Sequence, residues 1–317
     1  MGTLYIDRKD LFLKLEGNAI SIYYNGKKEG SIPLNPVKRI IVSSNIIFET
    51  RLIKRLVDNN ITVIFLSGKN MRFCGILRGS LHNNGLLRVQ QYKSYLDEEF
   101  RINFSKELIL RKLQRHKELL EEWQYLNHQS ISLAIKTIEE ITKSLNSFTY
   151  SIETIRGMEG GAASAFFSAY ILLFDKKLNF CNRNRRPPLD PVNAVLSLCY
   201  TLVHYEVVRE IEIAGLDPTI GFYHEFEYGR ESLACDIVEL FRPCVEEFVF
   251  RTFNEKNFTE DDFINNDKKA GCYLKKESRE KFYFTYEEWI KNLRPLIRNE
   301  VREIARRLIG EEKSLLE

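Results

Sequence analysis

The sequence is poor in the features that mark secreted, disulfide-rich or zinc-binding proteins. Its six cysteines are scattered over 317 residues, with no CxxC pair and no framework spacing. Such thiols are expected to be reduced and mostly buried. The first residues, MGTLYIDRKD, contain no apolar stretch leading to a cleavage site. No signal peptide is predicted, and the expected location is the cytoplasm.

Long hydrophobic runs and a strong excess of one charge are also missing. The most apolar helical segment, Ala194 to Val208, is interrupted by polar residues and is too short to cross a bilayer, so it predicts a core helix and no membrane partner. The formal net charge is only +3, so any site for a polyanion has to be local. The absence of GxxxxGKS/T, HExxH and GxSxG motifs argues against ATP hydrolysis, zinc proteolysis and serine-hydrolase chemistry.

The patterns that are present predict an α+β protein with two domains. Short β-branched and aromatic runs fill about the first 80 residues, and Asn25-Gly26 between two of them predicts a hairpin, because a type I′ turn needs two positive φ angles. One helix is expected at about 48 to 59. We therefore predict a β-rich N-terminal domain, residues 1–86, followed by a larger all-α catalytic domain, residues 87–317.

Basic residues follow the helical pattern in two places. From about residue 104 to 126 leucines form one helix face and basic side chains line the other faces, namely Lys106, Arg111, Lys112, Arg115 and Lys117. Near the end of the chain, a helical pattern interrupted by Pro295 carries Arg298, Arg302 and Arg306 at i+4 spacing. That spacing predicts one cationic stripe.

Glu159 has glycine neighbours in RGMEGGAASAFFSAY, at the expected start of a helix. Glycines leave space around the carboxylate, so an ion or a phosphate could approach it, and amides of a first helical turn would add favourable dipoles. The alternative is a carboxylate that only caps the helix, and the local sequence favours neither.

Three arginines, Arg183, Arg185 and Arg186, precede a Pro187-Pro188 break. The break predicts an exposed, non-helical loop whose guanidinium groups could clamp phosphates. An ordinary solvated connector explains the same residues and is the more frequent outcome for such a cluster.

His224 lies in a loop after a helix expected at about 191 to 214. A lone histidine is more often a packed or surface residue than a metal ligand. Its interpretation changes with the segment SLACDIVELFRP, which carries Asp236 and Glu239 at i, i+3 in a helix expected to begin at a Ser232 cap and to end before Pro243.

The face that Asp236 and Glu239 share is surrounded by apolar residues. Two close carboxylates in such a setting repel each other unless a cation intervenes, and Arg242 is the alternative partner. One imidazole with two or three carboxylates suits Mn²⁺, or Mg²⁺ where carboxylates and water dominate. At a phosphodiester such an ion would polarise the phosphoryl oxygen and stabilise the leaving oxygen, so the residues indicate phosphate chemistry.

Four segments, RGMEGGAASAFF, RNRRPPLDPVNAVLSLCYTLVHYEV, GLDPTIGFYHE and SLACDIVELFRP, resemble the CRISPR-associated Cas1 integrase family in order and spacing. The similarity is strongest from about residue 150 to 245, and the last 70 residues contribute little. Members of that family have a β-rich N-terminal domain and a helical C-terminal domain. The resemblance implies that Glu159, His224 and Glu239 bind Mn²⁺ or Mg²⁺, with Asp236 as an auxiliary catalytic carboxylate.

The resemblance also implies a function in spacer acquisition. Homodimers assembled around a Cas2 dimer would join short double-stranded DNA into the CRISPR repeat, by attack of a 3′-hydroxyl on a repeat phosphodiester. The N-terminal domain is expected to serve in dimerisation and DNA contact. The candidates for phosphate contacts are Arg183, Arg185, Arg186, Arg298, Arg302 and Arg306. Two alternatives are a nuclease of branched or single-stranded DNA that does no joining, and a non-catalytic DNA-binding scaffold.

Overall fold

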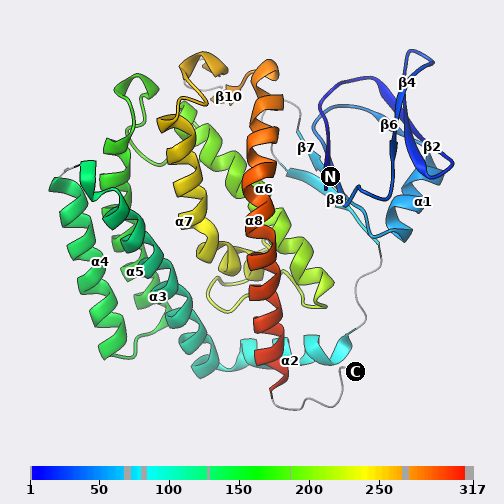
Figure 1. The fold of residues 1–317 in the computed structure, drawn as a ribbon. Coiled ribbons are helices and arrows are strands. Elements are labelled where there is room, and N and C mark those ends of the chain that lie inside the picture. Colours follow the sequence, from blue (N-terminus) through cyan, green and yellow to red (C-terminus); the bar gives the residue numbers. More distant parts are fainter. Residues whose placement is uncertain are drawn as a thin grey trace. The chain divides into compact units, whose positions relative to one another are not determined.

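The computed structural model describes residues 2–67, 73–79, 84–126, 129–185, 187–265 and 271–310. The chain divides into two compact units, Met1–Leu81 and His82–Glu317. The first is built mainly of strands and the second mainly of helices (Figure 1), which confirms the predicted α+β class. The boundary expected between residues 86 and 87 falls inside a helix of the second unit, α2 (Gly85–Leu96).

Strands of the N-terminal unit pair in two sheets. In the first, with the order β1-β5-β7-β8, the pairs β1–β5 and β5–β7 are parallel and β7–β8 is antiparallel. In the second, with the order β4-β3-β2-β6, the two hairpin pairs are antiparallel and β2–β6 is parallel. The strands are β1 (Thr3–Ile6), β2 (Leu11–Glu16), β3 (Ala19–Tyr24), β4 (Lys27–Pro33), β5 (Arg39–Val42), β6 (Ile47–Phe48), β7 (Thr62–Leu66) and β8 (Phe73–Leu77).

The hairpin predicted at Asn25-Gly26 is confirmed. Both residues have positive φ, 48° and 75°, and they join β3 to β4 in antiparallel register. The helix predicted nearby is α1 (Thr50–Asp58), which buries Leu52 and Leu56 in the core between the sheets and turns its charged face to solvent. The amphipathic pattern of the sequence is sufficient to explain this packing.

In the described part of the second unit, seven α-helices and several short 3-10 helices pack around α6 and α7. Helix α7 packs against both α3 and α6, while α5 packs against α3 and α4, and α8 runs along α6 (Figure 1). Beyond α2, the elements are α3 (Glu98–Glu122), η1 (Gln124–Leu126), α4 (Gln129–Ser147), α5 (Ile152–Tyr170), η2 (Ile171–Leu173), η3 (Lys176–Leu178), α6 (Pro191–Ile213), α7 (Ser232–Asn254), η4 (Glu260–Asp262), β9 (Phe263–Asn265), β10 (Cys272–Leu274) and α8 (Lys276–Ile309). The antiparallel pair β9–β10 is a small departure from the expected all-α domain.

Helix α6 is the predicted core helix, because most residues between Ala194 and Val208 are buried. Its start is fixed by Asp190, which accepts the backbone N–H of Asn193 at 2.8 Å, with Pro191 in the first turn. Among the described helices, none is long and apolar enough to span a membrane.

Two proline positions were predicted wrongly. Helix α7 continues through Pro243, and α8 continues through Pro295, although both were expected to end or interrupt a helix. A proline inside a helix loses one backbone hydrogen bond, but side-chain packing can outweigh that cost. Buried side chains lie on both sides of each proline, Phe241 and Val245 in α7, and Leu293 and Ile297 in α8.

No disulfide is present within the described ranges. The expectation that the thiols are mostly buried was wrong, because Cys199 and Cys272 are buried whereas Cys235 and Cys244 are only half-buried and Cys181 is exposed.

Candidate active site

Lys112 of α3 joins carboxylates from two other helices. Its Nζ donates a hydrogen bond of 2.5 Å to Oε2 of Glu239 on α7, and another to Oε1 of Glu159 on α5. The side chains of Lys112 and Glu239 are only 4% and 7% exposed, whereas that of Glu159 is 21% exposed. Two carboxylates that are distant in the sequence therefore share one cation, at a place that reaches solvent on the side of Glu159.

Glu159 lies about two turns inside α5 and not at its start. The cap is Ser151, whose side chain accepts the backbone N–H of Thr154. The capping interpretation and the role of first-turn amides were therefore wrong. A Cβ at Gly157 or Gly160 would meet nothing within 4 Å, so the glycines do leave open space on this helix.

Glu239 is held by two cations. Its Oε1 accepts a 2.7 Å hydrogen bond from Nε of Arg242, and its Oε2 accepts the bond from Lys112. Burial alone would raise the pKa of the Glu239 carboxyl, but the charges of Arg242 and Lys112 outweigh burial and lower that pKa well below its usual value. Glu239 therefore stays ionised, and the alternative partner Arg242 is indeed present beside the lysine.

Asp236 has a different environment from Glu239. It is fully buried, and its oxygens accept the backbone N–H groups of Phe222 at 2.6 Å, Tyr223 at 3.0 Å and His224 at 2.8 Å. Oδ1 also lies 2.8 Å from Nδ1 of His224. These bonds satisfy the carboxylate without a metal, so Asp236 fixes the loop that carries the histidine.

Gly221 allows this loop to lie against α7. A Cβ there would come within 2.7 Å of Oδ2 of Asp236 and 2.6 Å of the backbone of Ser232. Ser232 is the first residue of α7 and not its cap, and its hydroxyl donates to the carbonyl of Glu225 at 2.9 Å. Close backbone approach thus brings the loop and the start of α7 together.

His224 presents one ring nitrogen to Asp236, and its side chain is 26% exposed. A proton on Nδ1, donated to Asp236, leaves a lone pair on Nε2 for a ligand. Within the described ranges, however, no three His, Cys, Asp or Glu side chains are arranged to hold a metal ion. Lys112 takes the position that the two glutamates share.

Two arginines fasten the loop to neighbouring helices. Arg101 of α3 and Arg156 of α5 bind the same oxygen of Glu225, at 2.7 and 3.2 Å, and Arg156 also donates to the carbonyl of Tyr223. Burial raises the pKa of the Tyr223 hydroxyl, and the nearby carboxylates of Glu159 and Glu239 raise it further. Tyr223 therefore stays neutral and lines the site.

The sequence did not single out Lys112 as a site residue. It was assigned to a helix face other than that of the leucines, and that assignment is wrong, because Lys112 is buried together with them. A usable signal existed, because residue 112 follows Leu108 and Ile109, and precedes Leu113 and His116, on the buried stripe of α3. Lysine is almost never fully buried unless it is paired, so a lysine at a buried position of the helical pattern is informative.

The six arginines proposed for DNA contact differ in exposure. Arg183 is half-buried, because its guanidinium donates to Asn193 at 2.8 Å and Ser197 at 3.3 Å and lies over the ring of Tyr200. The expectation that it is displayed on the loop was wrong. Arg185 is exposed and Arg186 lies outside the described residues.

The predicted stripe on α8 is exposed at all three of its positions, Arg298, Arg302 and Arg306. Arg298 binds Glu210 at 3.2 Å, and Arg306 pairs with Glu303. Only part of the charge of this stripe is therefore uncompensated.

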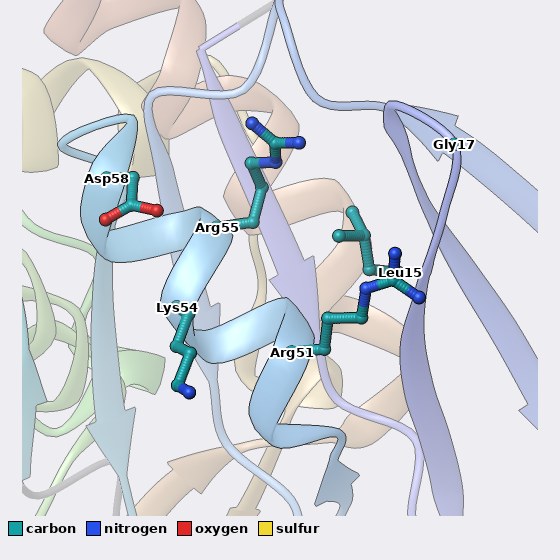
Figure 2. Close-up of a pocket in the computed structure, with 6 residues that line it drawn as sticks. All are labelled: Leu15, Gly17, Arg51, Lys54, Arg55 and Asp58. Atoms are coloured by element: carbon teal, nitrogen blue, oxygen red, sulfur yellow. The ribbon is translucent and has the colours of Figure 1, made fainter.

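The lining of a hollow of about 340 Å³ in the N-terminal unit carries three basic side chains and one acidic side chain, Asp58 (Figure 2). Arg51, Lys54 and Arg55 project from α1, and Leu15 and Gly17 lie across from Arg51. No ion pair forms at any of the three basic side chains in the part of the chain that the structure describes. Their charge is thus available to an anion.

The sequence profile of the family described as CRISPR associated protein Cas1 matches residues 4–288. The chain belongs to the Cas1 family. Among its Cas1 relatives, the CRISPR-associated endonuclease Cas1 1 of Thermodesulfovibrio yellowstonii is 49% identical over 319 residues, covering 100% of this chain and 99% of the relative. A Cas1 protein from Thermotoga maritima has a solved structure that matches with a TM-score of 0.83 and 26% identity, over 98% of both chains.

Two further structures share the Cas1 fold at lower identity. A casposase bound to integration product matches with a TM-score of 0.84 and 21% identity, over 99% of this chain and 92% of the casposase chain. A chain of a Cas6-RT-Cas1–Cas2 complex matches with a TM-score of 0.82 and 19% identity, over 98% of this chain and 35% of that longer chain.

Proposed function

We propose that this Cas1 protein is a divalent-metal-dependent DNA integrase, with associated endonuclease activity, that joins short DNA fragments into a CRISPR array. The observation that carries the proposal is the convergence of Glu159 and Glu239 on one cation, with His224 held by Asp236, which lies three residues before Glu239 on α7. Two carboxylates and an imidazole are donors that Mn²⁺ accepts, and Mg²⁺ is served by the carboxylates and water.

Glu159, Glu239 and Nε2 of His224 would hold the ion. When bound, the ion supplies Lewis-acid stabilisation of charge on the attacking and leaving oxygens of a phosphodiester. With the lone pair of Nε2 used by the ion and Nδ1 committed to Asp236, His224 would act as a ligand and not as a general base. Asp236 acts through His224 by fixing the orientation of the ring.

The reaction is a transesterification. A 3′-hydroxyl of the incoming DNA attacks a repeat phosphodiester, so one phosphodiester bond forms as another breaks. The attacking hydroxyl loses its proton, and the displaced strand leaves through its 3′-oxygen, which accepts a proton. Because the number of phosphodiester bonds is unchanged, no ATP is required. Water in place of the 3′-hydroxyl would give the associated endonuclease activity with the same ligands.

The DNA is held through its phosphates, since the enzyme has to accept fragments of many sequences. The hollow beside α1 supports DNA contact by the N-terminal unit. Arg185 and Arg186 with the stripe on α8 are the candidate contacts of the second unit, whereas Arg183 serves to hold the loop. Reversing the charge of Arg185 and Arg186 should weaken binding across all sequences and flatten its salt dependence, and unchanged affinity rejects their role.

We further propose that the protein works in the cytoplasm, as a homodimer assembled with a Cas2 dimer. The absence of disulfides in the described ranges is compatible with a reducing compartment. The related chain in the Cas6-RT-Cas1–Cas2 complex supports a Cas2 partner, and the casposase supports integration chemistry on this fold.

A strand-transfer assay tests the proposal. Purified protein, its Cas2 partner, Mn²⁺ or Mg²⁺, labelled duplex ends and a repeat-containing plasmid should give joined products that disappear with a chelator. Shortened products alone would indicate the nuclease alternative. Glu159→Gln should retain DNA binding and lose joining, whereas a non-catalytic scaffold would function fully after that change.

A further inference from the structure

A lysine is an unusual residue for the position of Lys112. Its neighbours on the buried stripe of α3 include Ile109 and Leu113, and its own side chain is 4% exposed. An ammonium so deeply buried needs anionic partners, and Lys112 donates to both Glu159 and Glu239. The side chain is therefore a cation in contact with both glutamates.

The charges of the two glutamates are already balanced before any metal binds. Glu159 and Glu239 contribute two negative charges, and Lys112 and Arg242 contribute two positive ones. Both oxygens of Glu239 are engaged, Oε1 by Arg242 and Oε2 by Lys112. A divalent ion that approached this arrangement would meet two cations at close range, and like charges at that distance repel strongly.

The two cations differ in how easily they can leave. Arg242 contacts only Glu239 of the pair, and its planar group lies over the ring of Tyr200 at 4.7 Å. Lys112 occupies the position common to both glutamates and has a flexible stem of four carbons. Glu159, the more exposed partner, provides the side on which an ion can enter.

We propose that Lys112 is a built-in counter-ion that holds Glu159 and Glu239 together before metal binds, and then yields both carboxylates to the incoming divalent ion. Metal loading is thus a cation exchange, and Lys112 is a positioning residue whose charge sets the metal affinity. This inference rests on the proposed metal-dependent function and adds the step by which the metal enters.

Calorimetric titration of Mn²⁺ into the full-length protein, at pH 7 and without DNA, tests the exchange. Lys112→Met removes the charge and keeps an unbranched side chain, so it should bind Mn²⁺ at least about tenfold more tightly than the wild type. Lys112→Arg keeps a cation and should bind no more tightly than the wild type. Circular dichroism and thermal unfolding establish that each variant is folded.

Lys117→Met is the matched control. Lys117 lies on the same helix and also faces two glutamates, Glu121 at 3.6 Å and Glu139 at 2.6 Å, away from the site. Its replacement should leave the Mn²⁺ affinity unchanged. Equal or weaker binding by Lys112→Met, with normal binding by the wild type, overturns the exchange while the metal-dependent function stands. No Mn²⁺ binding by the wild type overturns both.

A measurement on the wild type covers the case in which Lys112→Met does not fold. Amine acylation followed by peptide mass spectrometry should find Lys112 protected without divalent ion and several-fold more reactive at saturating Mn²⁺. Lys117 should react equally in both conditions. Unchanged protection of Lys112, in protein that calorimetry shows to be loaded, overturns the exchange.

Discussion

Replacing Asp236 by asparagine isolates the part of the site that orients His224. In the wild type, four N–H groups converge on this carboxylate, three from the backbone of residues 222–224 and one from the histidine ring. Asparagine has one carbonyl oxygen in place of two carboxylate oxygens, so two of the four donors lose their acceptor and face an amide NH₂. Hydrogen bonds to a charged group contribute about 1.5 to 3 kcal/mol each, so Asp236→Asn should destabilise the helical unit by about 3 to 6 kcal/mol.

Tryptophan fluorescence during urea unfolding measures this loss directly. Both tryptophans of the chain, Trp123 and Trp289, belong to the helical unit, so the signal does not report on the strands. The Mn²⁺ affinity should fall about 10- to 100-fold in the same variant, because an unfixed imidazole is a poorer ligand. A direct ligand role for Asp236 would instead abolish binding.

Asp217→Asn provides the comparison within the same loop region. Asp217 is half-buried, and it accepts hydrogen bonds from the backbone and hydroxyl of Thr219, at 2.9 and 2.6 Å, and from the hydroxyl of Tyr92 at 3.2 Å, but from no other backbone N–H or ring nitrogen that the structure describes. Its replacement should cost less than about 1 kcal/mol. The reasoning is refuted if Asp236→Asn is as stable as Asp217→Asn and keeps the wild-type Mn²⁺ affinity.

Three more predictions concern other parts of the chain. Glu246 lies 2.7 Å from His116, both 1% exposed, so Glu246→Gln should cost about 3 kcal/mol at pH 7. Burial would raise the pKa of Glu246, but His116 lowers it below the ordinary 4.5. The carboxylate therefore contributes fully to stability above pH 4.5, and the difference in unfolding free energy between wild type and variant should shrink as the pH falls below that value. A difference that stays constant with pH contradicts this. Gly221→Ala should destabilise the loop by at least about 1 kcal/mol and lower joining activity, and full activity with wild-type stability would disprove the close approach. The double change Arg51→Gln and Arg55→Gln should weaken duplex binding and reduce the slope of log affinity against log salt by about 2. An unchanged slope would show that the hollow does not bind DNA.

Local patterns predicted the parts of the fold that depend on local physics. Asn25-Gly26 specified a turn through its backbone preference alone, and the helix expected at about 48 to 59 is α1. Pro243 and Pro295 failed as stop signals because the helix-breaking tendency of one residue competes with tertiary packing along the whole helix.

Only part of the candidate site could be predicted from the sequence. Segments of unusual composition drew attention to Glu159, His224 and Glu239, and the resemblance to Cas1 proteins gave them a common role. Spacing along a single chain does not reveal which side chain from a third helix lies between two others. The contact of Lys112 with both glutamates, across sequence separations of 47 and 127 residues, therefore required the fold.

The same separations have a consequence for the chain as it is synthesised. The cluster draws on α3, α5 and α7, so its carboxylates cannot meet until the ribosome has released the chain well beyond residue 239 and α7 has docked on α3. At elongation rates of about 5 to 20 residues per second, several seconds pass between the synthesis of Glu159 and that of Glu239. A nascent or truncated chain thus lacks the cation cluster, and any activity that depends on it begins only with the finished helical unit.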